Sequence, residues 1–268
     1  VSFKVVKHAI EDATVTIDSI EYTGNPITPI IKVVFNGETL VEGTDYTVSY
    51  DTIINVDTYY ITITGINLFE GERTDEFEVT PADINKVTVT GLEDLVYTAA
   101  NITVNPVLTF NGNTVDSSNY SYKVMFNGAE SSILNAVKYT LVITGMNNFK
   151  GTKEVEFEVK PLSVNNVQFV AGSVIYNGEN QVPQVSGSYN NIEINTNDYT
   201  VSYDYTEFVN AGTYKLTITG KNNLVGSIEI EYVIEQLDIS HADATYEDPQ
   251  YYTQQQITPD ITLTYKGN

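Results

Sequence analysis

The stretch Tyr214-Lys-Leu-Thr-Ile-Thr-Gly-Lys-Asn-Asn-Leu-Val-Gly226 decides the fold of this chain, because related copies of it recur. The other two copies run from Tyr59 to Gly71 and from Tyr139 to Gly151. They repeat with a period of 75 to 80 residues, which is the signature of an array of small modules. Any account of function must therefore begin from repetition.

The composition predicts an all-β protein. Of 268 residues, 41% are hydrophobic and 18% charged, and the apolar residues are largely Val, Ile and Tyr, which favour strands. Asp45-Tyr-Thr-Val-Ser-Tyr50 alternates apolar and polar residues, as a half-buried strand does. Asn36-Gly37, Asn111-Gly112 and Lys266-Gly267 stand where tight hairpins are expected. We expect no helix of useful length.

Aligning the copies divides the chain into consecutive modules and predicts that the chain begins and ends in mid-module. The segment from Phe3 to Ile10 matches the closing strands of later copies, such as Phe77 to Ile84. The alignment predicts the closing strand of a preceding module at 1–10, complete modules at 11–84, 85–164 and 165–239, and a truncated module at 240–268. We therefore expect the natural polypeptide to be longer in both directions. The junctions lack Gly/Ser linkers and two contain Pro81 and Pro161, which predicts an end-to-end, semi-rigid rod.

Each copy opens on a tyrosine placed like the tyrosine corner of an immunoglobulin-type sandwich. Tyr59, Tyr139 and Tyr214 each stand two residues before an aliphatic, where strand F of such a sandwich has its core cysteine. This pattern predicts a β-sandwich in which an aliphatic residue takes the place of the core cysteine. The glycines of the recurring loop are expected to form a structural turn over Phe69, Phe149 or Leu224. These glycines are Gly65, Gly71, Gly145, Gly151, Gly220 and Gly226.

On these residues the chain resembles the tandem bacterial immunoglobulin-like (Big/MBG-type) repeats of Gram-positive cell-surface proteins and adhesins. The resemblance rests on Tyr22-Thr-Gly with Pro29, on the Asp45 and Asp198 strands, and on Asn210-Ala-Gly-Thr-Tyr. It covers essentially the whole chain and is loosest in the second module, where Ala99-Ala100 replaces the glycine turn. The resemblance implies a stalk or adhesin module without catalytic activity. The family has no invariant functional residues that could be assigned to positions of this chain.

Charge and cysteine content exclude several classes of function. The net charge of −22 repels phosphate backbones, so nucleic acid and anionic membranes are poor partners. No apolar run approaches a membrane span. The absence of cysteine removes disulfides, thiolate metal sites and cysteine nucleophiles, and it suits a bacterial surface or a phage particle.

No constellation of residues indicates catalysis, and we expect no cofactor. His8 and His241 lie at junctions and do not recur, so we interpret both as ordinary junction histidines. A Lys-Asn isopeptide crosslink is not indicated, because Lys32 is not retained in the other copies. Calcium bound between modules is the one metal hypothesis that we keep. Its candidate carboxylates are Glu11, Asp12, Asp83, Asp238 and Asp243. The alternative is that these carboxylates only form a solvated acidic surface.

Three functions remain open at this point. The first is a non-enzymatic extracellular stalk that projects a binding head from a bacterial surface, with neighbouring modules as partners. The second is a structural or decoration protein of a phage particle or filament. In the third, one module is itself an adhesin for a host protein, a glycan or another copy of the chain. Candidate places for such binding are exposed Tyr189 or Tyr251 and the expanded Ser117–Asn135 region of the second module.

Overall fold

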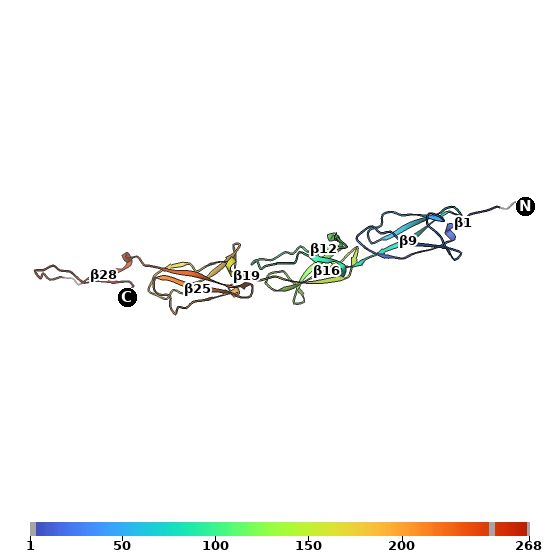
Figure 1. Cartoon of the computed structure of the whole chain (residues 1–268). Helices are drawn as coiled ribbons and strands as arrows, with labels where there is room; N and C mark the ends of the chain where they lie inside the picture. The colour runs from blue at the N-terminus through green and yellow to red at the C-terminus, as the bar shows by residue number, and fades with distance from the viewer. Residues whose placement is uncertain (1–3, 247–249, 267–268) are drawn as a thin grey trace. The chain divides into compact units, whose positions relative to one another are not determined.

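The computed structural model describes residues 4–246 and 250–266 (Figure 1). Phe3 of the expected closing strand and Gly267 of the expected last hairpin lie outside the described residues, as do other parts of segments 1–10 and 240–268. The described chain is all β, interrupted only by three-residue 3-10 turns. These turns are η1 (Ile10–Asp12), η2 (Ile84–Lys86), η3 (Ser117–Asn119), η4 (Val164–Asn166), η5 (Thr196–Asp198) and η6 (Ile239–His241).

The chain forms two compact units, each described by itself. The first comprises the residues up to 93, 103–132 and 138–158, and the second comprises 94–102, 133–137 and the residues from 159 onward. The division passes through the second copy of the sequence repeat. We use repeat 1, repeat 2 and repeat 3 for the segments 11–84, 85–164 and 165–239.

Repeat 1 is built from two sheets. One has the order β2-β4-β5 and the other the order β3-β9-β7-β6. The strands are β2 (Thr14–Ile17), β3 (Ile20–Glu21), β4 (Ile31–Phe35), β5 (Glu38–Thr39), β6 (Tyr46–Ser49), β7 (Thr58–Gly65), β8 (Phe69–Glu70) and β9 (Glu72–Thr80). The antiparallel succession β9-β7-β6 is the G-F-C order of immunoglobulin-like sandwiches, with the Tyr59 strand in the place of strand F.

The core of repeat 1 follows from the alternation of its strands. Ile61 and Ile63 of β7 have no exposed surface, and Phe77 and Val79 of β9 are buried beside them. Val33 of β4 contributes to the same cluster from the other sheet. Because side chains alternate across each strand, the residues between these positions face solvent. A cysteine-free module is thus held by packing between two sheets.

Repeat 2 has the corresponding sheets in the first unit, with one addition. Their orders are β11-β12-β13 and β15-β14-β16-β18. The strands are β11 (Thr88–Thr90), β12 (Val107–Phe110), β13 (Asn113–Thr114), β14 (Tyr120–Phe126), β15 (Ala129–Glu130), β16 (Lys138–Gly145), β17 (Phe149–Lys150) and β18 (Thr152–Glu158). The expanded region of this copy is the longer β14 and its hairpin to β15, turned by Asn127-Gly128, both with positive φ.

Repeat 3 lies in the second unit and returns to the shorter pattern. Its sheets have the orders β20-β22-β23 and β21-β27-β25-β24. The strands are β20 (Gln168–Val170), β21 (Ser173–Ile175), β22 (Ser186–Tyr189), β23 (Ile192–Glu193), β24 (Tyr199–Ser202), β25 (Gly212–Gly220), β26 (Leu224–Val225) and β27 (Ser227–Glu235), preceded at the end of repeat 2 by β19 (Leu162–Ser163). Beyond them, β28 (Asp243–Tyr246) pairs with β29 (Ile261–Thr264).

The segment 1–10 and the ends of repeats 1 and 2 are not simple spacers, because each of them pairs with the repeat that follows it. His8-Ala9 (β1), Ala82-Asp83 (β10) and Leu162-Ser163 (β19) each form a two-residue parallel bridge to the recurring loop of the next copy, through β8, β17 and β26. The alignment places these dipeptides in the segments 1–10, 11–84 and 85–164. Their backbone hydrogen bonds, which no side-chain pattern reveals, attach them to the following copy.

The two ends of strand β25 give a matched test of the loop glycines. A Cβ added at Gly220 would lie 2.8 Å from the backbone at Leu224 and Val225, whereas one added at Gly212 would meet nothing within 4 Å. We expect Gly220→Ala to lower the free energy of unfolding of repeat 3 by about 1–3 kcal/mol through overpacking. Gly212→Ala should be neutral or stabilising by up to about 1 kcal/mol. Urea unfolding measures both, and equal effects would contradict the role of Gly220.

Candidate functional site

The repeated tyrosines brace the chain that enters strand β7 or β25. The Tyr59 hydroxyl donates to the Asn55 carbonyl at 2.8 Å, and the Tyr214 hydroxyl donates to the Asn210 carbonyl at 2.7 Å. Tyr139, in β16, is buried and stacks on Phe157 with a centroid separation of 5.7 Å. Each acceptor carbonyl belongs to an Asn four residues upstream, and this Asn begins the short segment that we call the corner. The corners are Asn55-Val56, Asn135-Ala136 and Asn210-Ala211.

The recurring loop is closed by its first and last glycines and by its first asparagine. The last glycines, Gly71, Gly151 and Gly226, have positive φ, and the carbonyl of each accepts from the backbone N–H of the first glycine at 2.9–3.0 Å. The side-chain amides of the first asparagines donate to backbone carbonyls that lie just before β6, β14 and β24 in the chain. The pairs are Asn67 with Thr44, Asn147 with Ser118 and Asn222 with Asn197. These contacts recur in every copy, so they serve the fold.

The second asparagine of the loop does something different, because it reaches the preceding repeat. In the first unit, Asn148 is 9% exposed and accepts at Oδ1 from the Val56 backbone N–H at 2.8 Å. Its Nδ2 donates to Asn55 Oδ1 at 3.0 Å, and its own backbone N–H donates to Asn119 Oδ1 at 3.2 Å. One side chain therefore satisfies a donor and an acceptor of the repeat 1 corner.

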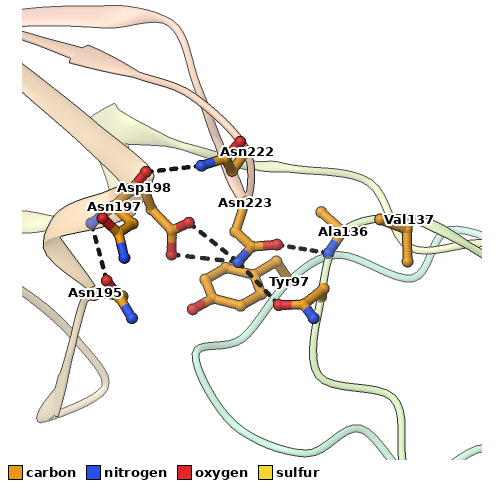
Figure 2. Close-up of a pocket in the computed structure, with 9 residues that line it drawn as sticks. Tyr97, Ala136, Val137, Asn195, Asn197, Asp198, Asn222 and Asn223 are labelled. Carbon is orange, nitrogen blue, oxygen red and sulfur yellow. Dashed lines mark hydrogen bonds between the residues drawn. The ribbon is translucent and has the colours of Figure 1, made fainter. Parts of the chain in front are cut away.

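The second unit contains the same arrangement one repeat further on (Figure 2). Asn223 Oδ1 accepts from the Ala136 backbone N–H at 2.8 Å, and Nδ2 donates to Asn135 Oδ1 at 3.2 Å. Nδ2 also lies 3.2 and 3.3 Å from the two carboxylate oxygens of Asp198, which is 3% exposed. Asp198 occupies the place of Asn119 in the other junction. We call Asn148 and Asn223 the loop asparagines.

Repeat 1 has Leu68 where the other copies have the loop asparagine. Its side chain is 70% exposed, and its backbone carbonyl accepts from the His8 N–H at 3.0 Å. The equivalent carbonyls of Asn148 and Asn223 accept from Ala82 and Leu162. The backbone contact is therefore common to all three copies, and only the side-chain contact with a corner needs asparagine.

Additional polar bonds cross the junction in the first unit. Asn111 Nδ2 donates to the Thr23 carbonyl at 3.0 Å, and Asn113 Nδ2 donates to the Gly24 carbonyl and to Asn25 Oδ1, both at 3.1 Å. Lys86 forms an ion pair with Glu21. Aromatic contacts also cross this junction: Tyr22 of repeat 1 stacks on Phe110 of repeat 2 and contacts Phe149 edge to face. A polar and aromatic interface thus couples these two repeats.

Two of the acidic residues considered for calcium cap 3-10 turns. Asp83 and Asp238 cap η2 and η6 by accepting the Asn85 and Ser240 backbone N–H groups at 2.9 and 2.8 Å, and Ser163 does the same for η4. These bonds lower the pKa of both carboxyls below the usual value. In the described part of the chain, no group of three or more His, Cys, Asp or Glu is arranged to hold a metal ion. Calcium between the modules stays a prediction.

The single arginine and one lysine hold equivalent 3-10 turns. Arg73 pairs with Asp75 through two bonds of 2.7 Å and donates to the Glu11 and Ala13 carbonyls around η1. Lys153 donates to the Asn85 and Val87 carbonyls around η2, at 2.9 and 2.8 Å. This role was missed from the sequence. The recurrence of a cation two residues after Gly71 and Gly151 could have indicated it.

The remaining candidates lie apart from one another. The His8 ring packs between Phe35 and Phe69, with centroid distances of 4.9 and 5.7 Å, whereas the His241 ring faces the Asp238 carbonyl. Tyr251 is 81% exposed, and Tyr189 is half-buried at the end of β22. No helix among the described residues has the length and apolar character needed to cross a membrane.

Comparison with known proteins yields similarity in structure only. No family model matches the chain, and no curated protein sequence matches it. Domains 1–6 of the surface layer protein SbsC align at 13% identity and a TM-score of 0.26 over 87% of this chain and 42% of that one. This chain thus spans less than half of that structure.

Tandem Ig and cadherin domains align at the same level. The N-terminal four Ig domains of Dscam1 give 12% identity and a TM-score of 0.26, covering 84% of this chain and 72% of that one. Cadherin domains 3–6 of protocadherin gamma B2 give 10% identity and a TM-score of 0.20, covering 90% of this chain and 77% of that one. Scores this low carry no argument about fold or function. The immunoglobulin-like assignment rests on the strand order described above.

Replacing a loop asparagine by the residue that repeat 1 carries tests the junction. We expect Asn223→Leu to leave the Ala136 N–H without its acceptor, which costs about 1–3 kcal/mol. Amide exchange at Ala136 should then accelerate by roughly 5- to 150-fold. The Val56 amide, held by Asn148 in the other unit, is the internal control, and Asn148→Leu should reverse the pattern. Unchanged exchange at Ala136 would contradict the assignment.

The capping carboxylates predict an acid-dependent loss of stability. Because the folded pKa of Asp83 and Asp238 lies below the unfolded one, their stabilisation is present above about pH 4 and is lost as pH falls through the folded pKa. Asp83→Ser/Asp238→Ser keeps a cap, as Ser163 does, but cannot titrate there. Between about pH 5 and pH 2 its melting temperature should fall less than that of the parent. Glu78→Ser, at an exposed site, should follow the parent.

Proposed function

We propose that the chain is a structural segment of an extracellular surface protein, in which consecutive immunoglobulin-like repeats act as a stalk. One observation carries the proposal: the loop asparagine of one repeat binds the corner of the preceding repeat in both units. A protein whose repeats acted as independent beads would have no use for this recurring contact. A stalk needs it, because reach depends on resisting bending at the junctions.

The distribution of recurring contacts within the array also supports a mechanical role. Residues that recur in all copies are used in turns, corners and cores, such as Gly65, Tyr59 and Ile61. The acidic surface, with a net charge of −22, opposes association between neighbouring chains and keeps tandem β modules soluble. Catalysis forms no part of the proposal. A bacterial surface is the setting we favour, from the resemblance and the absence of cysteine.

Small-angle X-ray scattering on the whole chain tests the stalk. We expect the parent chain to scatter as an ensemble with a narrow range of end-to-end distances. Asn148→Leu/Asn223→Leu should broaden that range and lower the radius of gyration, because both corner contacts are removed. A single replacement of an exposed residue outside the junctions, Tyr60→Ser, is the control. If the parent itself scatters as freely jointed beads, the stalk is ruled out.

A further inference from the structure

A polar pocket lies beside the loop asparagine of the second unit, between residues 97 and 135–137 of repeat 2 and residues 195–198 and 222–223 of repeat 3 (Figure 2). Its volume is about 440 Å³, which falls in the range of roughly 300–1,000 Å³ usual for small-molecule sites. Tyr97, Asp198 and five asparagines dominate its lining, and no cationic side chain takes part. The asparagines are residues 135, 195, 197, 222 and 223.

The walls of this pocket are held in place without any ligand. Asn223 is fixed to Asp198 and to the Ala136 N–H, as described above. Asn222 Nδ2 donates to the Asn197 carbonyl at 2.8 Å, and Asn195 Oδ1 accepts from the Asn197 backbone N–H at 2.9 Å. Tyr97 is 7% exposed, and burial together with the charge of Asp198 raises its pKa. A preorganised wall lowers the entropic cost of binding.

Several polar atoms of the lining stay open to a ligand. The bonds at Asn197 use its backbone N–H and carbonyl, so its exposed side-chain amide is available. The bond at Asn195 uses Oδ1 and leaves the Nδ2 donor, whereas the bond at Asn222 uses Nδ2 and leaves the Oδ1 acceptor. Side-chain amides offer two donors and one acceptor oxygen, which complements hydroxyl groups that both donate and accept.

In the first unit, the equivalent space beside the loop asparagine is narrowed by contacts that the second unit does not make. There, Phe110 stacks on Tyr22, and Asn113 bonds to Gly24 and Asn25, so the space beside the loop asparagine is about 180 Å³. A separate space of about 350 Å³ lies at the same junction beside Lys86 and Asn111, away from the loop asparagine. In repeat 3 the hairpin positions of Phe110 and Asn113 are held by Tyr189 and Ile192, whose turn has the same geometry. The acceptor Asn25 is likewise replaced by Ala100. The asparagine pair Asn113–Asn25 that bridges the first junction is therefore absent from the second.

From this geometry we infer that the pocket is a binding site for a neutral carbohydrate. Asn197, Asn195 and Asn222 are positioned to bond sugar hydroxyls, with Tyr97 in the lining. An anionic ligand would meet the buried carboxylate of Asp198 and a chain of net charge −22. An apolar ligand would leave the amides unpaired, at a cost of about 1–3 kcal/mol for each buried group. Neutral hydroxyl-rich rings satisfy both constraints.

The test is a microarray of neutral, sialylated and sulfated oligosaccharides probed with the labelled whole chain. We expect at least one neutral glycan to bind, and Asn197→Ala to weaken its binding by roughly 5- to 30-fold through the loss of one or two hydrogen bonds. Ser118→Ala, at the equivalent position of repeat 2, is the matched control and should bind as the parent does. Binding of acidic glycans alone, or of none, overturns the inference.

A second variant closes the pocket instead of trimming it. Ala100→Asn/Ile192→Asn restores the asparagine pair that bridges the first junction, at two positions that are not fully buried. We expect it to reduce glycan binding while the melting temperature holds. Binding that is unaffected by both Asn197→Ala and the closing variant places the glycan elsewhere and overturns the site. The scattering test of the stalk does not depend on any of these outcomes.

Discussion

The backbone amide of the corner, once it faces the next repeat, must find an acceptor there. Val56 and Ala136 are partly buried, and an unpaired amide in such a place costs about 1–3 kcal/mol. A side-chain amide solves the problem in one residue, because its oxygen accepts from the corner N–H while its nitrogen donates to the corner asparagine. This reciprocal pair attaches repeat 2 to the corner of repeat 1 in the first unit and repeat 3 to the corner of repeat 2 in the second.

Each module is also stabilised internally, by packing and by local hydrogen bonds. Without disulfides, each sandwich depends on a packed interior. The position of the immunoglobulin core cysteine is taken in the three repeats by fully buried aliphatic residues, Ile61, Leu141 and Leu216. Backbone groups at the turns are satisfied locally, by Asp83 and its equivalents at the 3-10 turns and by Arg73 and Lys153 around them. Recurring contacts therefore build and join the modules. Specific recognition is expected where copies diverge, as at Ala100 and Ile192.

Much of this architecture could be predicted from particular residues. Alternation in the Asp45 strand, the Asn36-Gly37 turn and the Tyr59 position each predict a local geometry that a short stretch of chain determines alone. The attachment of Ala82-Asp83 to the following copy could not be predicted in this way, because it consists of backbone bonds to residues more than sixty positions away. The role of Asn148 was hidden for the same reason. A repeated asparagine in a polar loop looks like turn chemistry until its distant partner is known.

The sequence by itself determined the all-β character of the chain, its repeating organisation and the places of its turns, since these follow from alternation, glycine conformation and periodicity. Only the tertiary structure decided which of two adjacent asparagines serves the fold and which serves the junction. Asn147 and Asn148 are chemically identical, and the difference lies in whether the side chain faces its own loop or the corner of another repeat. It likewise decided that the space beside the loop asparagine is smaller in the first unit than in the second, because that depends on whether side chains from two repeats meet.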